Sequence, residues 1–174
     1  MERIRSYKLT KKYGVMESLK IFVIYDSKTG NTEKLAHAIA DGAASIEGVI
    51  VEVKKIGEPF SLSKLAEVDL AVFGSPVRYA NVTEEMRWFL SNLRGFIEKG
   101  RMRMEGKRAA VFGSYGYDGA WIMEETLRGM LKTMGYNVHD EICVEIDSNL
   151  KLNPVRSLEK CKAFGKKLAE SLTD

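Results

Sequence analysis

The sequence is poor in cysteine and has no long apolar segment, and each absence argues against a class of protein. Only two of its 174 residues are cysteines, Cys143 and Cys161, and they do not form a C-x-x-C pair. This count argues against a zinc site and against a framework of disulfides. No apolar run approaches the roughly 20 residues of a membrane span, and no signal-peptide apolar core follows the N-terminus. We therefore expect one soluble, cytoplasmic domain with no membrane contact.

Basic residues are concentrated at the start of the chain. Residues 1–20 contain six lysines and arginines but only two acidic residues, whereas the whole chain has a formal net charge of +3. A basic patch can bind nucleic acid, but few aromatic residues lie among these charges, and a solvated tail is the simpler interpretation. We predict no nucleic-acid partner. We divide the chain into a basic N-terminal extension, residues 1–19, and a folded domain, residues 20–174.

Short apolar segments alternate with amphipathic helical patterns throughout the folded domain. The candidate strands are residues 21–25, 49–53, 70–73, 109–112 and 142–146. Apolar residues recur at helical spacing over residues 35–43, 86–93, 123–134 and 158–172, and residues 62–67 are a candidate short helix between the second and third strands. Strands that alternate with helices in this way predict an α/β fold, a doubly wound parallel sheet with helices on both faces.

Ligands of such sheets bind beyond the carboxyl ends of the strands, so the loops after the first, third and fourth strands form the candidate site. The first loop supplies hydroxyls, an amide and a glycine directly before a helix, where a phosphate dianion can bind. Its residues are Ser27, Lys28, Thr29, Gly30, Asn31 and Thr32. The Walker pattern of nucleoside triphosphatases is absent.

The second and third loops carry aromatic residues and glycines. The second loop consists of Ser75, Pro76, Val77, Arg78, Tyr79, Ala80 and Asn81, before a helix that Thr83 is expected to cap. The third loop consists of Ser114, Tyr115, Gly116, Tyr117, Asp118 and Gly119. Tyrosines next to a backbone that can approach closely suit a flat ring. Together the three loops predict a site for a planar ring that carries one phosphate.

These residues resemble the flavodoxin-like FMN-binding family over residues 20–174. Residues 27–32 look like the family's [ST]-x-T-G-N-T phosphate loop, and residues 113–116 are similar to the flavodoxin domains of flavo-diiron proteins. Residues 74–81 look like the tryptophan-repressor-binding-protein family of NAD(P)H:quinone oxidoreductases. The resemblance implies a five-stranded sheet of order 2-1-3-4-5 and FMN as cofactor. Its phosphate would lie on the first loop, and Tyr79 and either Tyr115 or Tyr117 would contact the flavin ring.

Two functions are compatible with this resemblance. One is electron transfer between redox partner proteins, in which the flavin does the chemistry and no side chain acts as a catalytic acid or base. The alternative is an FMN-dependent oxidoreductase that uses NAD(P)H to reduce quinones or related acceptors. Flavodoxins that stabilise the semiquinone often have a glycine in the second loop. No glycine lies between Ser75 and Thr83, but Asn81 tolerates a left-handed backbone and can substitute for it.

Other functions of the same fold find less support. A phosphorylated receiver domain needs an aspartate at the end of the third strand, and residues 73–75 contain none. Neither cysteine begins the C-x-x-x-x-x-R signature of a phosphatase. We predict that Cys143 is a buried strand residue and Cys161 a helix-face residue, rather than a redox pair. Core packing is the simpler expectation for Trp88 and Trp121, and the alternative for Trp121 is contact with the flavin edge. The oligomeric state is left open between monomer and dimer.

Overall fold

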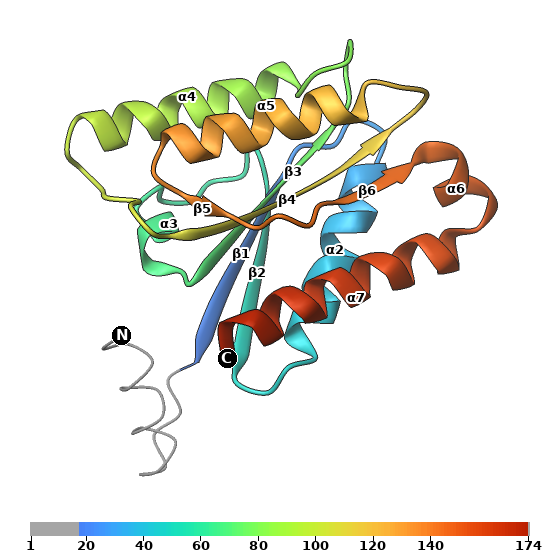
Figure 1. Ribbon diagram of the computed structural model, residues 1–174, viewed down its shortest axis with the longest axis horizontal. Helices are drawn as coiled ribbons and strands as arrows, with labels where there is room; N and C mark the ends of the chain where they lie inside the picture. The colour runs from blue at the N-terminus through green and yellow to red at the C-terminus, as the bar shows by residue number, and fades with distance from the viewer. Residues whose placement is uncertain (1–17, 174) are drawn as a thin grey trace.

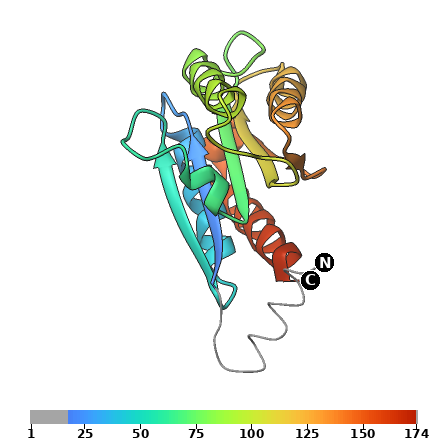
Figure 2. The ribbon, with the colours of Figure 1, turned by 90° about the vertical axis from the view of Figure 1, so that its left-hand side faces the viewer.

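The structure is a computed structural model that describes residues 18–173. A parallel sheet lies between two layers of helices (Figure 1). Helices α4 (Glu84–Glu98) and α5 (Ala120–Thr133) lie on one face, and α2 (Asn31–Ala44) and α7 (Pro154–Thr173) lie on the other, as the view along the sheet in Figure 2 also shows. Nearly all of the predicted basic extension, residues 1–19, falls outside the described residues.

The strand order is the predicted one, β2-β1-β3-β4-β5, and all pairs are parallel. The four long strands are β1 (Leu19–Tyr25), β2 (Val49–Lys55), β3 (Leu70–Pro76) and β4 (Arg108–Tyr115). Because the strands are parallel and adjacent, the carboxyl ends of β1, β3 and β4 lie side by side at one edge of the sheet. This edge is where the three candidate loops begin.

The predicted fifth strand is divided into two short strands. Both β5 (Asn137–Val138) and β6 (Cys143–Ile146) pair with β4, at its start and at its end respectively. Between them the chain leaves the ladder, since the Glu141 N–H is donated to the His139 ring at 3.2 Å rather than to β4. The sheet therefore keeps the predicted order, while the place of its outermost strand next to β4 is shared by β5 and β6.

Alternate residues of the central strands are buried in two hydrophobic clusters on opposite faces of the sheet. In β1, Phe22 and Ile24 join the cluster beneath α4 and α5, and Ile21 and Val23 join the cluster beneath α2 and α7. Successive side chains of a strand point to opposite faces, so a strand covered on both faces is apolar throughout. This explains why the continuous apolar runs of the sequence predict the strands correctly.

The helical predictions are confirmed, with one further helix that was not predicted. The short helix α3 (Lys64–Glu67) is present as expected, whereas α6 (Asp147–Leu152) was not predicted. The expectation that both tryptophans pack in the core is wrong. Trp88 of α4 and Trp121 of α5 are 72% and 68% exposed, because the buried faces of their helices are formed by other residues.

Helices α2 and α7 approach each other through two glycines. A Cβ atom on Gly165 of α7 would lie 1.9 Å from the carbonyl oxygen of Ile39, and one on Gly42 of α2 would lie 1.9 Å from that of Lys162. Real side chains cannot approach a backbone oxygen so closely. The two helix backbones are therefore in direct contact where they cross, and this contact depends on the absence of two side chains.

Tyr25, the last residue of β1, gives the folded state a dependence on alkaline pH. Its hydroxyl donates a hydrogen bond to Glu33 Oε1 at 3.0 Å. Burial, followed by the hydrogen bond and the charge of Glu33, raises the pKa of Tyr25 from 10.0 to about 12. Because folding raises this pKa, the contribution of the neutral phenol to stability is complete below pH 10.0 and is lost as the pH rises toward 12.

We therefore expect alkaline pH to destabilise the wild type more than Tyr25→Phe. Between pH 10.0 and pH 12, the unfolding free energy of the wild type should fall by about 2 kcal/mol more than that of the variant. One pKa unit corresponds to about 1.4 kcal/mol. Urea denaturation at both pH values measures the difference. Equal losses in the two proteins would contradict the assignment.

Candidate functional site

The structure brings the three predicted loops together at the carboxyl edge of the sheet. The hydroxyls of Thr32, the last residue of the first loop, and Ser114, in the third loop, are 2.9 Å apart and buried. Lys28 of the first loop forms an ion pair with Glu85, in the first turn of α4 after the second loop. Segments that are far apart in the sequence therefore form one site.

The first loop ends at the start of α2, where the backbone donors are available. Gly30 is the N-cap residue with φ of 87°, a left-handed conformation that favours glycine, and no side chain caps this helix end. The side chain of Ser27 instead accepts a hydrogen bond from the Gly30 N–H at 3.1 Å, which closes the turn. The next N–H groups have no intrahelical acceptor, because they belong to the first turn of a helix. Together with the positive end of the helix dipole, they can bind a phosphate.

The second loop contains a tight turn at its tip. Arg78 and Asn81 exchange two backbone hydrogen bonds, of 2.8 and 2.9 Å, around Tyr79 and Ala80. These central residues have φ of 50° and 56°, as a type I′ turn requires, although both carry side chains that disfavour this conformation. The suggestion that Asn81 supplies the left-handed residue is therefore wrong. Its side chain instead accepts the Val82 N–H at 2.8 Å.

After the turn, hydroxyl groups fix the start of α4. Ser75 accepts a hydrogen bond from the Thr83 N–H at 3.1 Å, and Thr83 accepts one from the Met86 N–H at 3.3 Å. The prediction that Thr83 caps this helix is confirmed. Unlike the start of α2, the start of α4 therefore has a side-chain cap of its own.

The third loop lies directly against the second. Gly119, the N-cap residue of α5, has φ of 78°, and a Cβ atom added to it would lie 2.7 Å from the Cα of Ala80. A glycine is therefore required here both by the backbone conformation and by the close approach of the second loop. The two loops form one continuous wall beside the first loop.

The predicted site residues lie at three depths. The base of the site consists of five buried residues: Ser27, Thr32, Ser75, Ser114 and Gly119. Half-buried residues form its walls: Gly30, Asn31, Pro76, Val77, Ala80, Asn81 and Tyr115. The rim is exposed: Lys28, Thr29, Arg78, Tyr79, Gly116, Tyr117 and Asp118. Tyr79 and Tyr117 are 98% and 96% exposed, so these two rings extend from the rim rather than lining the base.

Two carboxylates at the site were missing from the predicted set. Asp26, between β1 and the first loop, is 4% exposed, and its Oδ2 has no hydrogen-bond partner among the described residues. Asp147, directly after β6, also has a buried unpartnered oxygen, and its other oxygen is 3.9 Å from where a Cβ of Gly116 would lie. The position of Asp26 after a buried strand was a usable signal, whereas Asp147 could not be found without α6.

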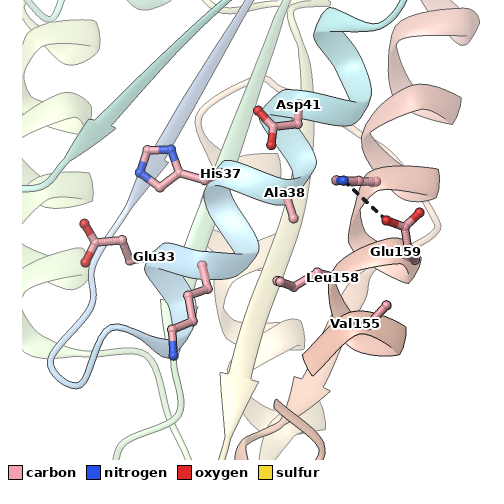
Figure 3. Close-up of a pocket in the computed structure, with 9 residues that line it drawn as sticks. Glu33, His37, Ala38, Asp41, Val155, Leu158 and Glu159 are labelled. Atoms are coloured by element: carbon pink, nitrogen blue, oxygen red, sulfur yellow. Dashed lines mark hydrogen bonds and ion pairs between the residues drawn. The ribbon is translucent and has the colours of Figure 1, made fainter. Parts of the chain in front are cut away.

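A groove between α2 and α7 is lined by residues that belong to none of the three loops (Figure 3). It has a volume of about 620 Å³, and its charges are partly paired, since Glu159 and Lys162 are 3.3 Å apart. It is lined by Glu33, Lys34, His37, Ala38, Asp41, Val155, Leu158, Glu159 and Lys162. Within residues 18–173, no three His, Cys, Asp or Glu side chains are grouped closely enough to hold a metal ion. The groove therefore presents no metal-ligand set, and the loops remain the candidate site.

The protein has an α/β fold with a candidate site for a phosphorylated planar cofactor at the three loops, and comparisons with known proteins identify its family. The flavodoxin family profile matches residues 23–153, so the chain belongs to the flavodoxin family. A flavodoxin from the domain Archaea is 26% identical with a TM-score of 0.73, over 90% of this chain and 100% of that chain.

Two other solved structures have the same fold at lower identity. A WrbA-like flavodoxin from Agrobacterium tumefaciens is 17% identical with a TM-score of 0.74, over 89% of this chain and 98% of that chain. The flavodiiron protein from Giardia intestinalis is 20% identical with a TM-score of 0.70, over 96% of this chain but 39% of that chain. The predicted resemblance is thus confirmed.

FMN is the cofactor of the family, and the protein is an FMN-binding electron-transfer flavoprotein. The residues present fit this group. The uncapped start of α2 offers donors to a phosphate, and the unpartnered Asp26 Oδ2 offers an acceptor to a ligand that carries hydroxyls. No helix within residues 18–173 has the length and apolar character needed to cross a membrane.

Proposed function

We propose that the protein carries electrons between redox partner proteins in the cytoplasm, with FMN held by the three loops of residues 20–174. Bound FMN supplies the reversible uptake and release of electrons. The observation that carries the proposal is the exposure of Tyr79 and Tyr117, 98% and 96%, on the two loops that would flank the ring. A partner protein can approach this open rim directly.

Each loop has a separate role in the proposal. The N–H groups at the start of α2, with the hydroxyls of Ser27 and Thr32, bind the phosphate, and the buried Thr32–Ser114 contact fixes their position against the third loop. The second and third loops hold the ring, and their mutual contact at Ala80 and Gly119 keeps the space between them constant. These contacts orient the cofactor without a catalytic acid or base.

The alternative function is an NAD(P)H-dependent reductase of quinones, and the second loop favours it. No glycine lies between Ser75 and Thr83. The left-handed residues in this loop are Tyr79 and Ala80, which already occupy a strained turn. If the backbone of this loop cannot change conformation at low cost, the loop would not stabilise the one-electron state of a bound flavin relative to its oxidised and fully reduced states.

Stepwise anaerobic reduction of the FMN-loaded protein, followed by visible absorbance, tests the proposal. Two resolved one-electron steps, without oxidation of NADH or NADPH in the presence of a quinone, would support the carrier. A single two-electron step combined with turnover of NADH or NADPH and a quinone would establish the reductase instead. The test uses the full chain of 174 residues.

The Asp26→Ala variant tests whether this carboxylate receives the cofactor. It should raise the dissociation constant of FMN about 10- to 100-fold, since a hydrogen bond to a charged group is worth about 1.5–3 kcal/mol. The apo protein should be no less stable, because the unpartnered buried oxygen is removed. Isothermal titration with FMN and urea denaturation of the apo protein measure the two effects. Unchanged affinity, or loss of affinity together with loss of apo stability, would sink the assignment.

A further inference from the structure

A second group of reactive side chains lies where β6 meets α7, outside the three loops. Cys143 of β6 and Cys161 of α7 are 2% and 0% exposed, and their sulfur atoms are 3.1 Å apart. Both are free thiols in contact through a hydrogen bond. Cys143 is a buried strand residue and Cys161 lies on a helix, as predicted. Their contact was not expected, because one is on a strand and the other on a helix 18 positions later.

The surroundings of the pair make the two thiols chemically different. The hydrogen bond from Cys161 lowers the pKa of Cys143 and outweighs burial, which raises it. The nearby Lys160 ammonium also lowers this pKa, and the carboxylates of Glu145 and Glu141 oppose it. The pKa of Cys161 is raised by its hydrogen bond to Cys143 and by burial. Cys143 is therefore the better nucleophile, and Cys161 retains its proton.

The lysine that favours the Cys143 thiolate is held in place by other contacts. Lys160 donates hydrogen bonds to the Val144 carbonyl at 2.8 Å and to Glu145 Oε1 at 2.6 Å. Glu145 is itself 7% exposed and accepts a hydrogen bond from the Ser157 hydroxyl at 2.5 Å. The thiol pair thus lies beside a positioned cation and an ordered polar network, which distinguishes it from two cysteines that merely fill space.

We infer that Cys143 and Cys161 form a dithiol that hydrogen peroxide oxidises to an intramolecular disulfide between β6 and α7. The Cys143 thiolate attacks one peroxide oxygen, the O–O bond breaks, and hydroxide leaves and takes up the proton lost by Cys143. The Cys161 sulfur then attacks the resulting sulfenic acid at sulfur. The S–S bond forms, and water leaves with the Cys161 proton. Two thiols lose two hydrogen atoms in total, and one peroxide becomes two waters.

The disulfide would close a loop that contains β6, α6 and the first turns of α7. This loop includes Asp147, which neighbours Gly116 in the third loop. Cross-linking a loop of this length restricts the unfolded chain and raises the melting temperature by about 5–10 °C for a protein of this size. The inference does not depend on FMN or on the proposed electron transfer, since the pair and the oxidant suffice.

Treatment of the FMN-loaded full-length protein with hydrogen peroxide tests the inference. We expect both thiols to become unavailable to a thiol reagent in denaturant, the intact mass to fall by two hydrogen atoms, and the melting temperature to rise by about 5–10 °C. Dithiothreitol should reverse all three changes. Peptide mapping without reduction should recover the residue 143 and 161 peptides as one cross-linked species.

Matched single variants identify the roles of the two thiols. Cys161→Ser should form a stable sulfenic acid on Cys143 and show no rise in melting temperature, whereas Cys143→Ser should react much more slowly. If the wild type keeps two titratable thiols, or gains oxygen atoms instead of losing hydrogen, the inference is overturned. The wild-type mass and melting temperature, with and without dithiothreitol, decide this even where a variant fails to fold.

Discussion

Gly165→Ala is expected to lower the unfolding free energy by about 2–3 kcal/mol, although alanine is the better helix former. The added Cβ would lie 1.9 Å from the Ile39 carbonyl oxygen, so α2 and α7 must move apart. The obstacle is a backbone atom of a buried helix, which cannot rotate away as a side chain can. Separating the helices would loosen the cluster on this face of the sheet, which includes Ile39, Cys161 and Phe164.

Gly129→Ala is the matched control for this prediction. Gly129 lies inside α5, and a Cβ atom there would meet no heavy atom within 4 Å. The same substitution should therefore stabilise the protein by about 0.5–1 kcal/mol through helix propensity alone. Urea denaturation of the two variants separates the free-energy cost of the close contact between α2 and α7 from the gain in helix propensity. A Gly165→Ala protein as stable as Gly129→Ala would show that α2 and α7 are not in direct backbone contact.

Gly30→Val is expected to weaken FMN binding about 10- to 100-fold, because a branched residue at φ of 87° carries strain of about 1–3 kcal/mol. In the apo protein the loop can relax away from this conformation. Binding requires the turn that Ser27 closes at the start of α2. The substituted residue must therefore adopt the strained backbone conformation when the phosphate binds, and the strain energy reduces the affinity. Titration of the apo variant with FMN, followed by the quenching of flavin fluorescence, measures the loss.

Gly106→Val separates the phosphate site from a general effect of backbone strain. Gly106 also has a positive φ, 74°, and open space around it, but it lies before β4 at the opposite end of the sheet. This variant should lose stability while its affinity for FMN stays within about twofold of the wild type. Equal loss of affinity in the two variants would contradict the placement of the phosphate at the first loop.

Much of the fold was predictable because burial on two faces leaves a strong pattern. Continuous apolar runs identified β1, β3 and β4, and polar loops after them identified the edge where the site lies. The helical period also predicts that the tryptophans are exposed. Trp88 is two residues from the buried Met86, on the other side of α4, so the pattern indicated exposure.

The remaining features depend on contacts that no local pattern encodes. The left-handed residues of the second loop are Tyr79 and Ala80, because the Arg78–Asn81 hydrogen bonds impose a type I′ turn that neither residue favours. The Cys143–Cys161 contact depends on how α7 lies against β6. The unpartnered oxygen of Asp26 becomes visible only when the surrounding atoms are placed.

The division of the last strand also bears on how molecules of this protein meet one another. A long, flat outer strand would present a row of free amide and carbonyl groups to which another chain could add. Here β5 spans two residues and β6 four, and residues 139–142 between them have no register partner in β4. The Val144 carbonyl oxygen already accepts a hydrogen bond from Lys160. An extended chain from a neighbouring molecule would find no continuous register to join on this side of the sheet. The interrupted strand therefore protects a concentrated solution of the protein from sheet-to-sheet aggregation at that edge.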